Sequence, residues 1–144
     1  SLPGYASLAV YPYEKEEIVA ICKPDHPLMQ KGDILDIAQL ADYPLAVPFD
    51  CLDLVRSSFG HRLLAPNISI ITSSNATAIE WARSFGTIAL ASLTTADFQH
   101  IKDLAVKHFS DDNLFITSAF IVNKEYPLSR AARNFLGFHG VDVG

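Results

Sequence analysis

The stretch IVAIC, residues 18–22, is apolar at every position. A strand with one face in water alternates apolar and polar residues, so an unbroken apolar run predicts a strand that is covered on both faces. Pro24 and Pro27 follow and end the run, because proline cannot donate a backbone hydrogen bond to a sheet. Similar runs alternate with helical patterns along the rest of the chain, and this order predicts an α/β fold.

The first half of the chain predicts two helices with acidic caps. At residues 36–41 the pattern D-x-x-Q is a capping box, which opens a short helix that Pro44 terminates. A brief buried strand at 45–47 leads into a second helix, for which Asp50 is the expected N-cap. The apolar face of this helix has helical spacing and consists of Leu52, Val55, Phe59 and Leu63.

A polar turn at residues 73–77 follows the next predicted strand, at 68–72. It opens a helix that Gly86 ends, because glycine adopts the left-handed backbone conformation without steric cost. The inner face of this helix is expected to hold Ala78, Ala82 and Phe85.

The alternation continues to the end of the chain. Strands are expected at 87–91 and 104–107, with a short helix that starts near Thr94 between them. Residues 114–122 are apolar on both faces and therefore predict a central strand. Ser129 is the expected N-cap of a last helix. That helix is expected to bury Ala132, Phe135 and Leu136.

Charge and hydropathy argue against two kinds of partner for this chain by itself. Its net charge is −5 and its pI about 5.4. Affinity for nucleic acid rests mainly on clustered Lys and Arg, so the chain alone is not expected to bind DNA. No apolar run is long enough to cross a bilayer, and a mean hydropathy of +0.20 is typical of a globular chain. Its 144 residues suit one compact domain, or one and a half lobes.

Cysteine and histidine usage predicts neither a cofactor nor a metal site. Cys22 and Cys51 form neither a CxxC motif nor a zinc spacing, which favours a reduced, cytoplasmic setting. The five histidines are scattered without an H-x-x-x-H pattern or a mixed Cys/His cluster. The sequence also lacks G-x-S-x-G and G-x-x-x-x-G-K-[ST], the signatures of a hydrolase nucleophile and of a phosphate-binding loop.

Residues 22–28, CKPDHPL, place a thiol, a carboxylate and an imidazole close together, as an active site would. Pro27 pushes His26 out of helical space, so the segment is interpreted as the exit from a strand, with His26 in a turn. An enzyme could instead use Cys51 and His61, but they are ten positions apart on the predicted helix and could not touch. The sequence therefore favours a protein that is not an enzyme.

The segment EEIVAICKPDHPLMQKGDILDIAQLADYPLAVP, residues 16–48, resembles the effector-binding domain of LysR-type transcriptional regulators. In that family a strand leads to an HPL turn, a short DL…P helix and a further strand, and these parts occur here in the same order. Residues 86–92 are similar to the family's GxGIALLP turn and strand, although the second Gly and the Pro are absent. Lys124 and residues 128–135 are similar to its K…LS.AA..F ending. The resemblance runs from about residue 11 to residue 138.

The resemblance implies an α/β fold of the periplasmic-binding-protein type II kind, with Rossmann-like lobes built from a mixed sheet and flanking helices. Residues 1–144 would then be a partial effector-binding domain, made of the second subdomain, the crossover strands and the C-terminal helix. The first subdomain and the helix-turn-helix domain, which precede this region in the family, are absent from the sequence.

The function that the resemblance implies is that of a cytoplasmic regulator with a small-molecule effector. Such a regulator would be a tetramer at full length and would bind DNA only through the helix-turn-helix domain, with no membrane contact. We expect the chain itself to form a dimer, because residues 114–122 and the last helix would expose apolar surface. The alternative is the solute-binding protein of a transporter, which shares the fold class but is secreted; a Cys/His enzyme is the third possibility.

Two strand-to-helix turns form the expected ligand site. In an open α/β sheet, ligands bind beyond the carboxyl ends of the strands, where helix N-termini present free N–H groups and a positive dipole end. The second turn has hydroxyl and amide groups and no acid, so it could bind a carboxylate or a phosphate. Simple N-capping by Ser74 or Asn75 is the alternative for that turn. The expected ligand-binding residues are Pro48, Phe49, Ser73, Ser74, Asn75 and Thr77.

Overall fold

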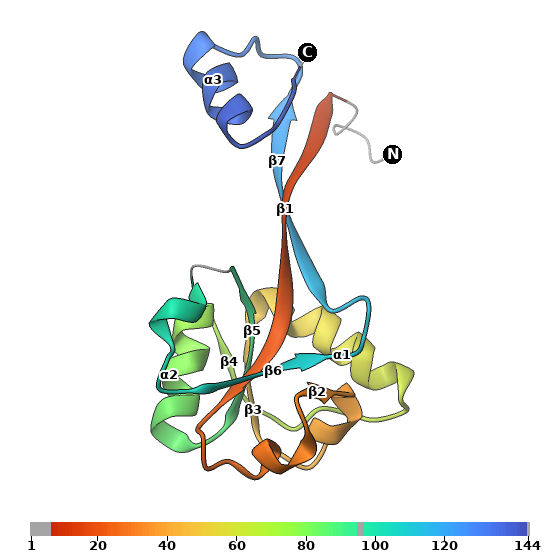
Figure 1. Ribbon diagram of the computed structural model, residues 1–144. Coiled ribbons are helices and arrows are strands. Elements are labelled where there is room, and N and C mark those ends of the chain that lie inside the picture. Colours follow the sequence, from red (N-terminus) through yellow and green to blue (C-terminus); the bar gives the residue numbers. More distant parts are fainter. Residues whose placement is uncertain (1–6, 95–96, 144) are drawn as a thin grey trace. The chain divides into compact units, whose positions relative to one another are not determined.

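The computed structural model describes residues 7–94 and 97–143, and the chain falls into two compact units (Figure 1). The larger unit is Glu16–Ile116, and the smaller unit comprises Ser1–Lys15 and Thr117–Gly144. Two strands have residues in both units, namely β1 (Leu8–Cys22) and β7 (Phe115–Asn123). The smaller unit also contains the helix α3 (Arg130–Phe138).

The larger unit contains the remaining helices and strands, and its short 3-10 helices carry the label η. In chain order these elements are η1 (Pro27–Lys31), β2 (Ile34–Leu35), η2 (Ile37–Leu40), β3 (Leu45–Pro48), η3 (Phe49–Cys51), α1 (Leu52–His61), β4 (Ile68–Thr72), α2 (Asn75–Phe85), β5 (Ile88–Leu93), η4 (Asp97–His100) and β6 (Ala105–Phe109).

A mixed sheet is the centre of the larger unit, with the strand order β2-β6-β1-β5-β3-β4. β1 is antiparallel to β5 and β6, whereas β3 is parallel to β4 and to β5. Parallel neighbours need crossover connections, which α1 and α2 supply here. The two helices cover opposite faces of the sheet (Figure 1). This arrangement confirms the predicted mixed sheet with flanking helices.

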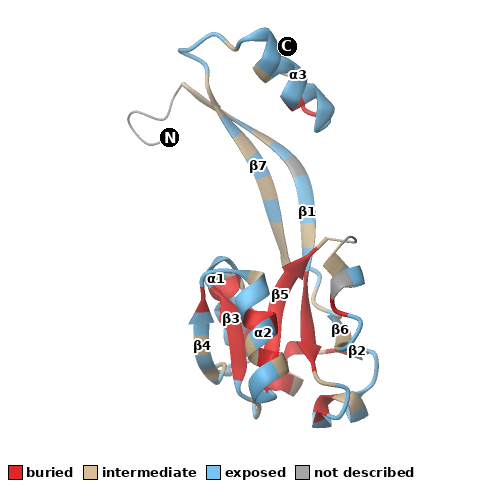
Figure 2. Cartoon of the chain, turned by 90° about the vertical axis from the view of Figure 1, so that its left-hand side faces the viewer, coloured by how far each residue is buried: buried red, intermediate tan, exposed pale blue. Residues whose placement is uncertain are grey.

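The apolar run in β1 is buried on both faces, as predicted. Ile18, Ala20 and Cys22 pack in the core that includes the inner face of α1. Val19 and Ile21 point the other way and pack in the core that includes the inner face of α2. All five side chains are 0% exposed, and Figure 2 shows the buried strands at the centre of this unit. Burying an Ile or Val side chain contributes about 1.5–3 kcal/mol, so this run stabilises both layers at once.

The predicted helix starts are confirmed at three places. Asp36 and Gln39 form the capping box of η2, in which each side chain accepts a backbone N–H at 2.9 Å. Ser74 caps α2, and Ser129 caps α3. Gly86 ends α2 with a φ of +68°, the left-handed conformation that made glycine the expected residue.

The start of α1 differs from the prediction that Asp50 is its N-cap. Pro48 leads directly into the 3-10 turn η3, and Asp50 lies inside this turn. No side chain caps η3, and the Leu52 N–H at its end donates to the Phe49 carbonyl. The reason is that Pro48, with φ of −60° and ψ of 144°, already holds the extended conformation of a cap residue.

Two side chains that were expected on inner helix faces are exposed instead. Phe85 is 66% exposed and lies against Trp81, with 4.4 Å between the ring centroids. Leu63 is 96% exposed and lies beyond the end of α1. Both predictions carried helical spacing to or past the last turn of a helix, where the chain begins to leave the core.

The prediction that residues 114–122 form a central strand is wrong. Among the residues that the structure describes, β7 pairs with β1 alone, and Ile121 is 65% exposed. On α3 only Leu136 is buried, whereas Phe135 is 54% exposed and Ala132 is half-buried. The apolar pattern of β7 predicted two buried faces, but side chains on this strand are exposed.

The predicted strands near residues 87 and 104 are confirmed as β5 and β6. The short helix expected near Thr94 is η4, although residues 95 and 96 lie outside the described residues. Asp97 reaches back from η4 and accepts the Thr94 N–H at 2.9 Å. Within 7–94 and 97–143, no helix has the length and apolar character needed to cross a membrane.

Candidate functional site

The carboxyl ends of β3 and β4 lie side by side at one edge of the larger unit. Pro48 and Thr72, the last residues of the two strands, are register partners in the parallel ladder. η3 and α1 begin directly after Pro48, and α2 begins after the cap residue Ser74. Neighbouring strands are about 4.8 Å apart, so the structure brings the two predicted turns together. We call this region the carboxyl edge.

The hydroxyl groups of the α2 turn are exposed and partly engaged in capping. Ser74 Oγ accepts the Thr77 N–H at 3.1 Å and lies 3.0 Å from Thr77 Oγ1. Thr72 Oγ1 donates to the Ser74 carbonyl at 2.8 Å, which holds the turn against the end of β4. The capping role that was the alternative for Ser74 is therefore present. Ser73, Ser74 and Thr77 remain exposed to solvent.

The first N–H groups of α2 have no acceptor in the described part of the chain. No hydrogen bond from the Asn75 or Ala76 N–H occurs there, as is usual for the first turn of a helix. These two donors, with the positive end of the helix dipole, face the exposed end of the turn. They can donate hydrogen bonds to an anion without breaking an existing bond.

Asn75 anchors the start of α2 to the end of β5. Its Nδ2 donates to the Ser92 carbonyl at 2.8 Å and to Ser92 Oγ at 3.3 Å, and its Oδ1 accepts the Ser92 N–H at 3.3 Å. Ser92 is buried. The Asn75 side chain is thus occupied in positioning the turn, so a ligand at this edge would meet its backbone N–H.

Cys51 lies buried at the start of α1 and also interacts with Ser92. Burial raises the pKa of its thiol to about 11, against a smaller lowering by hydrogen bonds with Ser92. A thiol with this pKa is protonated at neutral pH and is a poor nucleophile. His61 is the last residue of α1, at the other end of a helix about 15 Å long. The structure does not bring the pair of the enzyme hypothesis together.

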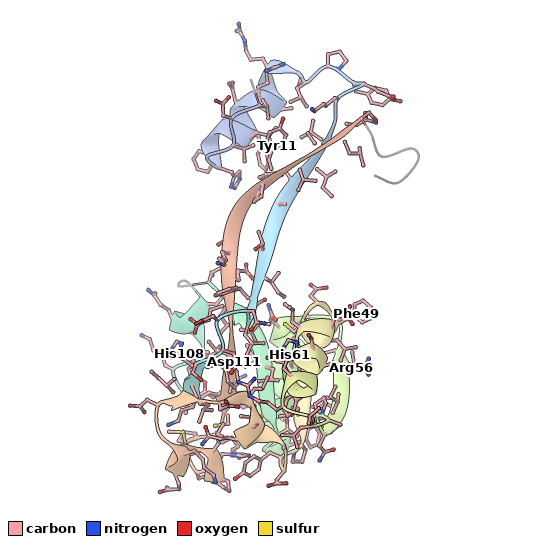
Figure 3. The ribbon with its side chains drawn as sticks, turned by 90° about the vertical axis from the view of Figure 1, so that its right-hand side faces the viewer. Tyr11, Phe49, Arg56, His61, His108 and Asp111 are labelled. Atoms are coloured by element: carbon pink, nitrogen blue, oxygen red, sulfur yellow. The ribbon has the colours of Figure 1, made fainter. Side chains whose placement is uncertain are left out.

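Pro48 and Phe49 form the other half of the carboxyl edge. Pro48 is buried, whereas Phe49 is 70% exposed at the start of the helical segment (Figure 3). An exposed aromatic ring is suited to hold the apolar part of a small ligand. The carboxylate of Asp50 follows on the same turn and is also exposed.

A pocket of about 460 Å³ lies beside α2 and begins at the same turn. Ser74, Asn75 and Ala76 line one end of it, and Ile79, Leu93 and Ile101 contribute apolar surface. The other predicted residues, Pro48, Phe49, Ser73 and Thr77, are not part of its lining. The predicted site thus divides between this pocket and the carboxyl edge.

The charged side chains along α2 are paired with one another. Arg83 contacts Glu80 and binds Asp103 through two bonds, Nε to Oδ2 at 2.7 Å and Nη2 to Oδ1 at 3.1 Å. The bond to Asp103 raises the pKa of Arg83 and lowers that of Asp103. No arrangement of three or more His, Cys, Asp and Glu side chains that could hold a metal ion is found within 7–94 and 97–143.

Ser92 and Thr72 are the residues that the sequence-based prediction missed. Ser92 is the polar position within the buried strand β5, and Thr72 is the polar end of β4. A buried polar side chain needs a hydrogen-bonding partner, and this rule could have drawn attention to both positions. The identity of their partners depends on contacts between distant segments.

The sequence matches the family model of the LysR substrate binding domain over residues 3–139. The chain belongs to this family. Both the predicted family and the predicted fold class are therefore confirmed. Among curated proteins, no sequence matches the chain.

Solved structures of LysR-family regulators share the fold of this LysR substrate binding domain. The effector-binding domain of QuiR in complex with shikimate is 20% identical with a TM-score of 0.77, and the match covers 96% of this chain and 66% of that one. The C-terminal domain of a probable LysR-family regulator from Rhodococcus sp. RHA1 is 20% identical with a TM-score of 0.74, covering 98% and 71%. The CcmR regulatory domain of Synechocystis PCC6803 in complex with 2-PG is 17% identical with a TM-score of 0.73, covering 96% and 68%. The chain thus spans about two thirds of the length of these structures.

Proposed function

We propose that this chain is the ligand-sensing part of a LysR-type transcriptional regulator and holds a small anionic effector at the carboxyl edge. The observation that carries the proposal is the pairing of Pro48 with Thr72, which places the starts of two helical segments beside each other. Membership of the LysR substrate binding domain family supports the same function. So do the QuiR and CcmR structures, which were solved with shikimate and 2-PG, because shikimate carries a carboxylate.

Each part of the carboxyl edge has a role in this proposal. The hydroxyls of Ser73 and Thr77 and the free N–H groups of Asn75 and Ala76 bind the anionic group. The exposed ring of Phe49 packs against the apolar part of the effector, and buried Pro48 fixes the turn from which the ring projects. Ser74 keeps its capping bond and holds the turn in shape.

The proposal extends to the place of this chain in a longer regulator. Residues 1–144 correspond to part of an effector-binding domain: the larger unit is the second subdomain, β1 and β7 are the crossover strands, and α3 is the C-terminal helix. The first subdomain and the helix-turn-helix domain belong to other parts of the regulator. DNA binding then occurs through the helix-turn-helix domain, in a cytoplasmic oligomer.

The proposed activity is regulation without a chemical reaction. Occupancy of the site shifts the balance between two arrangements of the regulator, by an amount set by the effector's different affinities for the two. Coupling of this kind is typically about 1–3 kcal/mol. The proposed partners are therefore a small-molecule effector and further copies of the regulator, with no cofactor.

The test of the proposal compares two sets of hydroxyl groups. A thermal-shift screen with small organic acids, shikimate included, identifies an acid that the chain binds, and calorimetry then measures its affinity. We expect the double variant Ser73→Ala/Thr77→Ala to weaken binding at least tenfold, because a hydrogen bond to a charged group contributes about 1.5–3 kcal/mol. Ser84→Ala removes an exposed hydroxyl near the other end of α2 and should bind as the wild type does.

Unchanged affinity in the double variant would exclude the anion site at this turn. A lower melting temperature with unchanged affinity would assign the turn to helix capping alone.

A further inference from the structure

One guanidinium group joins three segments of the larger unit. Arg62, the residue that ends α1, donates from Nε to the Asp36 carboxylate at 3.2 and 3.3 Å and from Nη2 to the same carboxylate at 3.0 Å. Nη2 also donates to Oδ2 of Asp111, in the turn between β6 and β7, at 3.1 Å. Ser58, one turn earlier on α1, donates to this same oxygen at 3.3 Å. We call Arg62, Asp36, Asp111 and Ser58 the clasp.

The clasp holds the turn that leads into β7. Ser110, beside Asp111, donates its N–H to the Leu35 carbonyl at 2.8 Å. On the other side of the turn, the Leu114 carbonyl accepts the Ile18 N–H at 2.9 Å. β7 starts at the next residue and continues from the larger unit into the smaller one. The clasp therefore acts on the point where the chain leaves the larger unit.

Two unfavourable features adjoin the clasp. Leu63, directly after Arg62, has a φ of +58°, a conformation in which a side chain is strained, and its side chain is 96% exposed and so gains no burial in return. The Asp111 side chain is only 4% exposed, and its Oδ1 has no hydrogen-bond partner among the described residues. A buried carboxylate oxygen without a partner is costly. Opening the clasp lets Asp111 Oδ1 reach water, whereas closing it gains the bonds of Arg62. The backbone of Leu63 is held separately, by bonds from the Leu63 and Leu64 N–H groups to the Gly60 and Phe59 carbonyls.

We propose that the clasp is a releasable device: it opens locally, without unfolding the larger unit, and sets the turn between β6 and β7 free at the root of β7. The buried, unpaired Oδ1 of Asp111 favours the open state. The bridge from Arg62 to Asp36 and Asp111 favours the closed state. The device needs no ligand, so it stands independently of the proposed effector site.

The test measures amide hydrogen exchange by NMR on the full 144-residue chain. The readout is the Ser110 N–H, which the clasp protects, and the reference is the N–H of Ala82, buried in α2. We expect Arg62→Gln to accelerate Ser110 exchange about tenfold or more, because it removes charge-assisted bonds to both carboxylates. The control is Arg56→Gln, an exposed residue on the side of α1 away from Asp111 (Figure 3).

A further variant keeps the test decisive if Arg62→Gln fails to fold. Asp36→Asn preserves the oxygen that caps η2 and removes only the charge, so we expect Ser110 exchange to accelerate up to roughly fivefold. In each variant Ala82 should keep its wild-type exchange rate.

The proposal is overturned if Arg62→Gln changes Ser110 exchange no more than Arg56→Gln does. It is equally overturned if Ser110 and Ala82 accelerate together, since the opening would then be global.

Discussion

His26 shows how the environment of one residue can make stability depend on pH. Its Nδ1 accepts the Leu28 N–H at 2.9 Å and thereby caps η1, and its ring lies edge-on against Tyr43 with 5.1 Å between centroids. Burial lowers the pKa of His26, and the nearby Asp25 charge offsets only part of this. The folded state therefore holds the neutral ring, with Nδ1 as the acceptor.

This environment predicts a loss of stability at mildly acidic pH. An unfolded His titrates near pH 6.5, so below that pH the unfolded state takes up a proton that the folded state resists. The free energy of unfolding should then fall between pH 7.5 and pH 5.5. His26→Asn keeps a capping acceptor and should fall less over the same interval in urea unfolding. His61→Asn, the same change at an exposed position, should match the wild type. Equal losses in the wild type and His26→Asn would contradict this account.

The buried thiol of Cys51 gives a second prediction, which concerns its reactivity. Burial raises its pKa to about 11, and the side chain is 0% exposed. Cys22 is buried as well, and burial raises its pKa. Because only the thiolate reacts, neither thiol should react with iodoacetamide at pH 7.5 until the protein is unfolded. Mass spectrometry before and after adding urea measures this, and rapid labelling of the native chain would show that the start of α1 opens readily.

Single residues could be predicted where the cause is local. The D-x-x-Q pattern at Asp36 and Gln39 was sufficient to predict the start of η2, because both partners of the capping box lie within one turn. Ser92 could not be assigned in the same way, since its partner Asn75 is 17 positions away. The left-handed backbone of Leu63 was also unpredictable, because glycine or asparagine is the usual residue there.

At the scale of the element, replacing glycine by alanine should have opposite effects on stability at the end of α2 and within α1. Gly86 ends α2 at φ +68°, so Gly86→Ala should lower the free energy of unfolding by about 1 kcal/mol through backbone strain. Gly60 lies within α1, and a methyl group there meets no atom within 4 Å. Gly60→Ala should therefore raise that free energy by about 0.5 kcal/mol. Urea unfolding of both variants measures the two changes, and shifts of the same sign would refute the conformational argument.

The types of the main elements followed from their patterns, whereas their ends and partners did not. The apolar run at 18–22 predicted only the buried part of β1, because the residues of the strand before this run include Glu14, Lys15 and Glu17. These charged side chains can lie in the strand because this part of β1 is not covered on both faces. For β7 an apolar pattern predicted a central position, but burial depends on what covers the strand, and a single strand does not contain that information.

At the scale of the whole molecule, the two units differ in how far the sequence predicts them. The larger unit is one continuous stretch, so successive strand and helix signals were enough to predict its fold class. The smaller unit joins the two ends of the chain, where the Lys124 N–H donates to the Ser7 carbonyl at 2.8 Å. Local patterns do not reveal a contact of that sequence separation.

Exposed apolar side chains on the smaller unit predict self-association. Val10, Ile121, Phe135 and Phe138 are 61%, 65%, 54% and 87% exposed. Large exposed apolar side chains of this kind favour contacts between molecules, so we expect a dimer in light scattering. Phe138→Ser combined with Ile121→Thr should shift the mass towards the monomer. A monomeric mass of the unaltered chain at high concentration would count against this prediction.

The central claim is that an anionic effector binds at the carboxyl edge of β3 and β4. Amide chemical shifts measured by NMR during titration with an organic acid that the chain binds test it most directly. We predict that the largest changes occur at Asn75 and Ala76, whose N–H groups are free, and at Phe49 and Asp50 on the neighbouring turn. Saturating changes confined to Arg83 and Ile101, at the other end of the pocket beside α2, with the carboxyl edge unchanged, would contradict it.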